Sequence, residues 1–194
     1  GADSWSLTVS GVGYGGSTAP LGSGVATATA NRVEYDYGAI SQWFVNGPLG
    51  LQQGFTLDAR PSGAAAGSPL TIDLAVGGGL TATPDATGTS VTLARADGSS
   101  SLVYGGLIAY DATGAAVPAR MVATQTTDGS VVSILVDDAD AVYPLTVDPY
   151  VQQTRVNGSV AKPYQFFGAS VAMNTSGTLA AVGAISSPPT TVRG

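Results

Sequence analysis

Residues 120–136 have the sequence RMVATQTTDGSVVSILV, in which two runs of strand-forming residues flank Asp128-Gly129. A Gly in such a pair supplies the positive φ that hairpin turns require. Both runs have the length of a β-strand and lack the spacing of an amphipathic helix. The segment therefore predicts an antiparallel hairpin that pairs residues 120–126 with residues 130–136.

The same two-residue alternation recurs along the chain, and helical periodicity is nearly absent. A second hairpin is predicted for residues 91–95 and 101–104 around Asp97-Gly98, and roughly twelve short strands separated by turns are typical of a sandwich. We therefore predict an all-β protein, an antiparallel β-sandwich with a short C-terminal β-hairpin. The apolar members of two further strands are Leu70, Ile72, Leu74 and Val76, and Trp5, Leu7 and Val9.

The composition excludes several classes of function. Of the 194 residues 10% are charged, the net charge is −6, and the chain contains neither His nor Cys. A Ser-His-Asp triad, a thiol nucleophile and a His/Cys zinc site are thus excluded. Seven basic residues are too few for a nucleic-acid-binding stripe. We expect a protein that is not an enzyme, has no nucleic-acid partner and has no membrane span, since no apolar run approaches ~18 residues.

A change of composition near Asp148-Pro149 predicts two parts, a β-sandwich domain over residues 1–150 and a separate segment over residues 151–194. Just upstream, residues 142–147 form an apolar run interrupted by Pro144. A Pro at this place suits an edge strand or the start of a strand.

The densest acidic cluster consists of Asp137, Asp138 and Asp140, at the predicted end of a strand. Oxygen-rich loops suit Ca²⁺, which takes six to eight oxygen ligands. The alternative is an Asp-rich turn in which the carboxylates accept hydrogen bonds from backbone N–H groups. Both interpretations remain open at this stage, and Ca²⁺ is the one cofactor that the sequence suggests.

Two further groups of residues have functional and structural interpretations. Glu34 and Asp36 share one face of a predicted strand, and a carboxylate pair is the minimum for glycoside hydrolysis. Arg32 lies on the same face, so we expect a solvated ion pair instead of catalysis. The aromatic residues favour core packing over sugar stacking. They are Tyr35, Tyr37, Trp43, Phe44 and Phe55 in the first third, and Tyr164, Phe166 and Phe167 near the C-terminus.

Residues 166–173 (FFGASVAM) and 177–184 (GTLAAVGA) form two short Ala/Val-rich runs. They resemble an FG-GAP repeat, the blade unit of integrin-α-type β-propellers. Phe167-Gly168 matches the first half and Gly183-Ala184 the second, with Ile185 where the family has Pro. The calcium-binding version of the repeat carries an Asp-x-Asp-x-Asp-Gly loop, whereas residues 174–177 contain no carboxylate. The resemblance implies a metal-free hairpin equal to half a propeller blade.

The upstream part also resembles a known region, through residues 32–35, 43–57 and 143–149. It is similar to the N-terminal region that precedes FG-GAP repeats in large secreted proteins of environmental bacteria. The resemblance implies an extracellular or cell-surface location and no catalytic residues.

The function predicted from these features is an extracellular structural or adhesive module. An unpaired apolar strand edge is a template for pairing, so the C-terminal segment is expected either to assemble chains by β-strand addition or to complete the sandwich of its own chain. The partner is then a second copy or another cell-surface protein. The alternative function is a carbohydrate-binding module with a glycan as its ligand.

Overall fold

The computed structural model describes residues 5–47, 50–64, 67–98, 101–152, 165–173 and 180–186, and all regular elements among them are β-strands. The chain divides into two compact units, Gly1–Thr154 and Arg155–Gly194. Among the described residues there is no helix long and apolar enough to cross a membrane.

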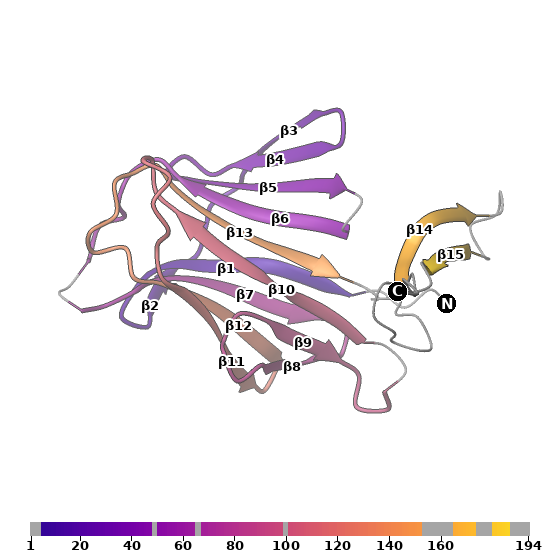
Figure 1. Cartoon of the computed structure of the whole chain (residues 1–194). Coiled ribbons are helices and arrows are strands. Elements are labelled where there is room, and N and C mark those ends of the chain that lie inside the picture. Colours follow the sequence, from indigo (N-terminus) through magenta and orange to yellow (C-terminus); the bar gives the residue numbers. More distant parts are fainter. Residues whose placement is uncertain are drawn as a thin grey trace, which may run out of the picture. The chain divides into compact units, whose positions relative to one another are not determined.

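The first unit consists of two antiparallel sheets that face each other, as Figure 1 shows. The prediction of an all-β antiparallel sandwich is confirmed. In spatial order, the larger sheet contains β3 (Val25–Thr29), β4 (Arg32–Asp36), β5 (Ile40–Gly47), β6 (Gly50–Leu57), β13 (Leu145–Gln152), β10 (Ser101–Tyr110), β9 (Val91–Ala94) and β8 (Thr81–Pro84). The smaller sheet contains β11 (Ala119–Thr126), β12 (Gly129–Val136), β7 (Leu70–Gly77), β1 (Ser6–Tyr14) and β2 (Ser17–Ala19).

The core lies between the two sheets and follows the predicted alternation. In β7 the four apolar residues at every second position are buried, while Asp73 and Ala75 between them are half-buried. The larger sheet contributes side chains with no exposed surface from its central strands β6 and β13. These are Phe55, Leu57, Leu145 and Val147.

Both predicted hairpins are present, and one of them turns a residue earlier than expected. β10 pairs with β9 from Ser101↔Ala94 to Tyr104↔Val91. β11 pairs with β12 up to Thr126↔Gly129, so Thr127 and Asp128 form the turn instead of Asp128 and Gly129. Gly129 is the first residue of β12, with φ 136, and a Cβ there would lie 3.1 Å from the Val76 carbonyl oxygen. The Gly is therefore needed for a close approach of strands as well as for the turn.

The region around Pro144 differs in part from the expectation. β13 begins at Leu145, directly after Pro144, so Pro144 does precede a strand. The strand lies between β6 and β10 in the interior of the larger sheet and is not an edge strand. Its own Pro149 has no N–H to donate. At this residue the pairing of β13 with β6 is interrupted between Val147 and Tyr150, and on the other side the register of β10 shifts between Gly105 and Ile108.

Two loops of the first unit are built on the same short sequence, Asp-Ala-Thr-Gly, at residues 85–88 and 111–114. In each, the Asp carboxylate accepts hydrogen bonds from the Thr hydroxyl two residues on and from the backbone N–H four residues on. Hydrogen bonds from the Thr113 hydroxyl and the Val142 N–H hold the pKa of Asp111 at about 2. These carboxylates stabilise turns, which is the ordinary role of Asp in such positions.

The second unit contains a two-stranded antiparallel sheet of β14 (Gln165–Met173) and β15 (Ala180–Ser186). The C-terminal hairpin is therefore present as predicted, with a register shift between Phe167 and Ser170. Residues 174–177, the predicted metal-free loop, lie outside the described residues.

Candidate functional site

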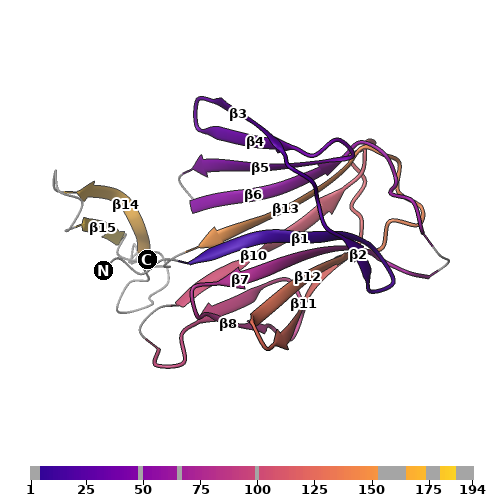
Figure 2. The same cartoon turned by 180° about the vertical axis from the view of Figure 1, so that it is seen from behind.

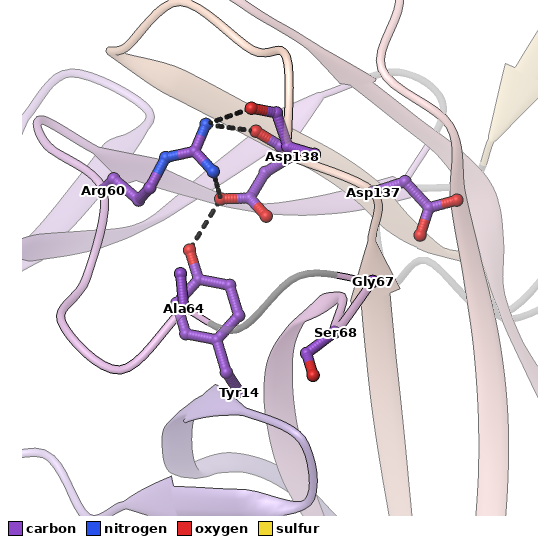
Figure 3. Close-up of a pocket in the computed structure, with 8 residues that line it drawn as sticks. Tyr14, Arg60, Ala64, Gly67, Ser68, Asp137 and Asp138 are labelled. Atoms are coloured by element: carbon purple, nitrogen blue, oxygen red, sulfur yellow. Dashed lines mark hydrogen bonds and ion pairs between the residues drawn. The ribbon is translucent and has the colours of Figure 1, made fainter.

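The carboxylate of Asp138 lies at the centre of a buried polar cluster at one end of the sandwich (Figure 3). Its Oδ2 accepts hydrogen bonds from the Tyr14 hydroxyl at 2.6 Å and from the Tyr143 hydroxyl at 2.5 Å. Nη1 of Arg60 lies 3.6 Å from the same oxygen. Nη2 of Arg60 donates to the carbonyl oxygens of Asp138 and Ala139, at 2.5 and 2.9 Å. The cluster thus connects β1, the segment after β6 and the segment after β12.

The electrostatics of this cluster favour neutral tyrosines. Burial and the hydrogen bond to Asp138 raise the pKa of Tyr14 to about 12. The same two causes raise the pKa of Tyr143 well above its ordinary value. Both hydroxyls keep their protons at neutral pH and donate to one carboxylate oxygen. Such charge-assisted hydrogen bonds are among the strongest in proteins, so the cluster is built to hold three segments together.

A hollow of about 500 Å³ lies beside this cluster, and Figure 3 shows side chains that line it. One wall is formed by Tyr14, Arg60 and Asp138, whose polar groups already bond to each other. The lining also includes the small residues Ala64, Gly67 and Ser68. The hollow has room for a ligand, but its polar groups are largely engaged within the protein.

The three acidic residues predicted as Ca²⁺ ligands do not act as one group. Asp138 is 2% exposed and faces the two tyrosines, whereas Asp137 and Asp140 are exposed. Asp137 and Asp140 line another hollow together with Asp111. In the described part of the chain, no three carboxylates are grouped closely enough to hold a metal ion. Calcium binding at this loop remains a prediction, and no sequence signal indicated Tyr14 and Tyr143 as the hydrogen-bond donors to Asp138.

A second hollow, of about 310 Å³, opens on the outer face of the larger sheet. Asp148 of β13 lies in it half-buried, and Nε2 of Gln52 donates to both of its carboxylate oxygens, at 2.7 and 2.8 Å. Burial raises the pKa of Asp148. Tyr150 and the 56% exposed Ile108 border the same hollow. Sequence reasoning missed this site because Gln52 and Asp148 are 96 residues apart.

The register of the strands explains why the second hollow exists. Gly106 has φ 64, and a Cβ on it would overlap the Tyr150 ring. The Tyr150 ring can therefore lie over the backbone of β10 at the register shift opposite Pro149. Glycines 47, 50 and 106 leave the floor of the hollow without side chains. A carboxylate, an amide and an aromatic ring consequently surround an open space.

The carboxylate pair on β4 has the predicted structural role. Arg32 and Glu34 form an ion pair at 2.8 Å, with both side chains more than a third exposed. Asp36 accepts a hydrogen bond from the Gly38 N–H and closes a turn. The Arg32 guanidinium also lies 4.6 Å from the centre of the Trp43 ring. Glycoside hydrolysis gains no support from this arrangement.

Among the aromatic residues of the first third, the predicted core packing is confirmed for Phe55, with Tyr37 partly buried against the core, whereas Trp43 is buried outside the core cluster. Phe55 and Trp43 are buried, and the Trp43 ring lies on Gly54. Tyr35 and Phe44 are half-buried and pack edge to face, with ring centres 6.3 Å apart. The predictions for Tyr164, Phe166 and Phe167 concern side chains outside the described part of the structure.

Residues 11–16 are rich in Gly and include the end of β1. This segment runs from β1 into the turn before β2, and no helix follows it among the described residues. Gly13 is there because β2 lies close: a Cβ on it would meet the Ser17 carbonyl oxygen at 2.2 Å. The glycines therefore serve strand pairing.

Comparison with known proteins finds no matching family model, no matching curated protein and no matching solved structure. The functional interpretation therefore rests on the sequence and on the geometry described above.

Proposed function

We propose that this chain is a structural or adhesive module of the bacterial exterior that assembles with other chains by β-strand addition through its C-terminal segment. The observation that supports this proposal most directly is the form of the second unit, where β14 and β15 make a two-stranded sheet. Neither strand contains a charged residue. An isolated two-stranded sheet is only marginally stable in water and gains stability when further strands pair with it.

The charge distribution of the whole chain supports the same proposal. Charged side chains, Lys above all, and Pro are the usual protection of strand edges against pairing with other molecules. This chain has 10% charged residues, and its single Lys lies outside all described strands. Low charge in the strands makes strand addition less costly than in an ordinary soluble domain.

The test compares the full chain with residues 1–154, a unit that contains the whole two-sheet core. Multi-angle light scattering after gel filtration measures the mass of both over a range of concentrations. The proposal expects the full chain to associate and the truncated chain to associate more weakly. Two monomers over the whole range would contradict it.

A second candidate function, carbohydrate binding, is favoured by the hollow around Asp148. A carboxylate and an amide side by side can accept and donate hydrogen bonds to neighbouring sugar hydroxyls, and Tyr150 offers a ring for stacking. A glycan array with the wild-type chain, Asp148→Asn and Tyr150→Ala tests this function. Saturable binding that both substitutions weaken supports it, and binding to no glycan contradicts it.

A further inference from the structure

The two sheets of the first unit have four edge strands, and three of them are protected. β8 has four residues and ends in Pro84. Ala82 of β8 donates its N–H to the Ser130 hydroxyl and accepts from the Gln125 amide. On β11, the N–H of Met121 donates to the Gly88 carbonyl oxygen. β2 has three residues and is followed by Pro20. Bound backbone groups, short length and Pro each discourage pairing with another strand.

The fourth edge strand, β3, has none of these protections. Its sequence is Val-Ala-Thr-Ala-Thr, without charge, Gly or Pro, and all five residues are exposed, Val25 at 68%. Within the described residues, β4 is the one strand that pairs with β3. Figures 1 and 2 show β3 at the end of the larger sheet, beyond the part that the smaller sheet faces. β3 is therefore the edge most open to strand addition.

The register shows which backbone groups of β3 are free. The N–H of Asn46 in β5 donates to the carbonyl oxygen of Asn31, so the backbone of Asn31 points toward β5. Backbone groups alternate in direction along a strand, hence those of Arg32 point toward β3 and its opposite residue Thr29. By the same alternation, the backbone N–H and C=O groups of Thr27 and Val25 point toward β4 and bond to it. The N–H and C=O groups of Ala26 and Ala28 point away from the sheet.

We propose that β3 is a self-association site, where it pairs antiparallel with β3 of a second copy about a two-fold axis at Thr27. In this register Ala26 of each copy lies opposite Ala28 of the other. The outward N–H and C=O groups of these two residue pairs then make four hydrogen bonds. Thr27 faces its own equivalent at the centre, where directly opposed Cα atoms lie ~4.5 Å apart and Thr pairs are favourable.

The occupant is a second copy because β3 is complementary to itself. Under the two-fold axis, Val25, Thr27 and Thr29 remain on one face of the joined sheet, and Ala26 and Ala28 on the other. This agrees with the alternation of both copies, and such isologous contacts close on themselves to give a dimer. Each chain carries a net charge of −6, but β3 itself is uncharged, so two copies of β3 add no charge repulsion of their own where they pair.

This inference rests on the proposed self-association but assigns it to a different segment, and one set of variants tests both. In Thr27→Lys, two lysines face each other across the axis. In Ala28→Pro, one outward N–H is lost while the bonds from β3 to β4 remain. Thr83→Lys makes the same change as the first variant on the protected edge strand β8. Each is made in the full chain and in residues 1–154.

The measurements are the dimer dissociation constant by sedimentation and amide hydrogen exchange. We expect Thr27→Lys and Ala28→Pro to weaken association at least about tenfold in both lengths of chain, because like charges or a missing donor then face each other. Thr83→Lys should leave association unchanged. The Ala26 and Ala28 amides should be protected at high protein concentration and exchange freely at low concentration.

The outcomes separate the two proposals. If residues 1–154 dimerise and Thr27→Lys prevents this dimerisation, β3 is a self-association site, independently of any association through the β14–β15 hairpin. Association that is lost on truncation but insensitive to Thr27→Lys and Ala28→Pro overturns the β3 site and leaves the hairpin proposal intact. A monomer for every chain at every concentration overturns both. Circular dichroism of each variant shows whether a loss of association reflects a loss of folding.

Discussion

Replacement of Asp138 by Ala should cost the first unit a large part of its stability. The carboxylate is 2% exposed and accepts hydrogen bonds from Tyr14 and Tyr143 at 2.6 and 2.5 Å. Each hydrogen bond to a charged group contributes about 1.5–3 kcal/mol. We add little for Arg60, because its side chain is 34% exposed and water screens the 3.6 Å ion pair. The expected loss is about 3–5 kcal/mol, within the range for breaking a buried pair.

Urea unfolding followed by tryptophan fluorescence measures this loss. With a slope of about 2 kcal/mol per M, the midpoint should fall by about 1.5–2.5 M. Tyr14→Phe and Tyr143→Phe each remove one hydrogen bond and should each cost less than Asp138→Ala. Asp137→Asn, a change at the exposed neighbour, is the matched control and should stay within about 0.5 kcal/mol of the wild type. A loss below about 1 kcal/mol for Asp138→Ala would refute the idea that this cluster holds the segments together.

The same cluster predicts a dependence of stability on alkaline pH. Because the pKa of Tyr14 is raised to about 12 in the folded chain, from 10.0, the folded state holds a proton that the unfolded state loses between these values. Stability should be complete below pH 10 and fall as the pH rises toward 12. Tyr14→Phe should make the fall shallower. The fall should not vanish, since burial also raises the pKa of Tyr143 and Tyr104.

Three further substitutions probe other parts of the sandwich. Gly54→Ala places a Cβ 2.0 Å from the Trp43 ring and should cost about 1–3 kcal/mol and shift Trp fluorescence. Gly47→Ala, whose Cβ would lie 4.0 Å from the Gly50 carbonyl oxygen at an ordinary contact distance, should do neither. Tyr104→Phe removes a buried hydroxyl that has no partner among the described residues, so its urea midpoint should equal or exceed the wild type's; a clear decrease would reveal a partner. The pKa of Asp111 is about 2 in the folded chain instead of 3.8, so its ionised form stabilises the fold above pH 4 and this stabilisation is lost as the pH falls to 2. In Asp111→Asn the melting temperature should therefore fall less between pH 4 and pH 2 than in the wild type.

Strands were predictable from this sequence because their signals are local. The alternation in residues 70–76 reflects one buried and one outer face of β7, and Gly at the predicted turns marks where strands reverse. Even here the turn before β12 lies one residue earlier than predicted, at a Gly129 where a Cβ would lie 3.1 Å from the Val76 carbonyl oxygen. Local pattern gives the strand, and packing of the neighbouring strand sets its end.

The polar clusters were not predictable, because their members come from distant segments. Nothing near Asp138 in the sequence indicates Tyr14, 124 residues away, as its hydrogen-bond donor. An Asp-rich segment suggests a metal site from composition alone, yet what a carboxylate binds depends on the groups that the fold brings to it. Here those groups are two hydroxyls, which donate hydrogen bonds to the carboxylate, and a guanidinium, which supplies positive charge as a cation would.

The hollow at Asp148 follows from a backbone irregularity in the sheet. Between Gly105 and Ile108 the pairing of β10 with β13 shifts its register, so that two residues of β10 lie opposite Pro149 alone. This shift moves Ile108 to the outer face opposite Asp148 and leaves the Gly106 backbone beneath the Tyr150 ring. A regular sheet would present alternating side chains here and no open space. Asp148 and Tyr150, the carboxylate and the aromatic ring of the second candidate site, lie on either side of Pro149 at this shift. Bulges of this kind often reposition side chains at binding sites, and that makes this face the first place to look for a ligand.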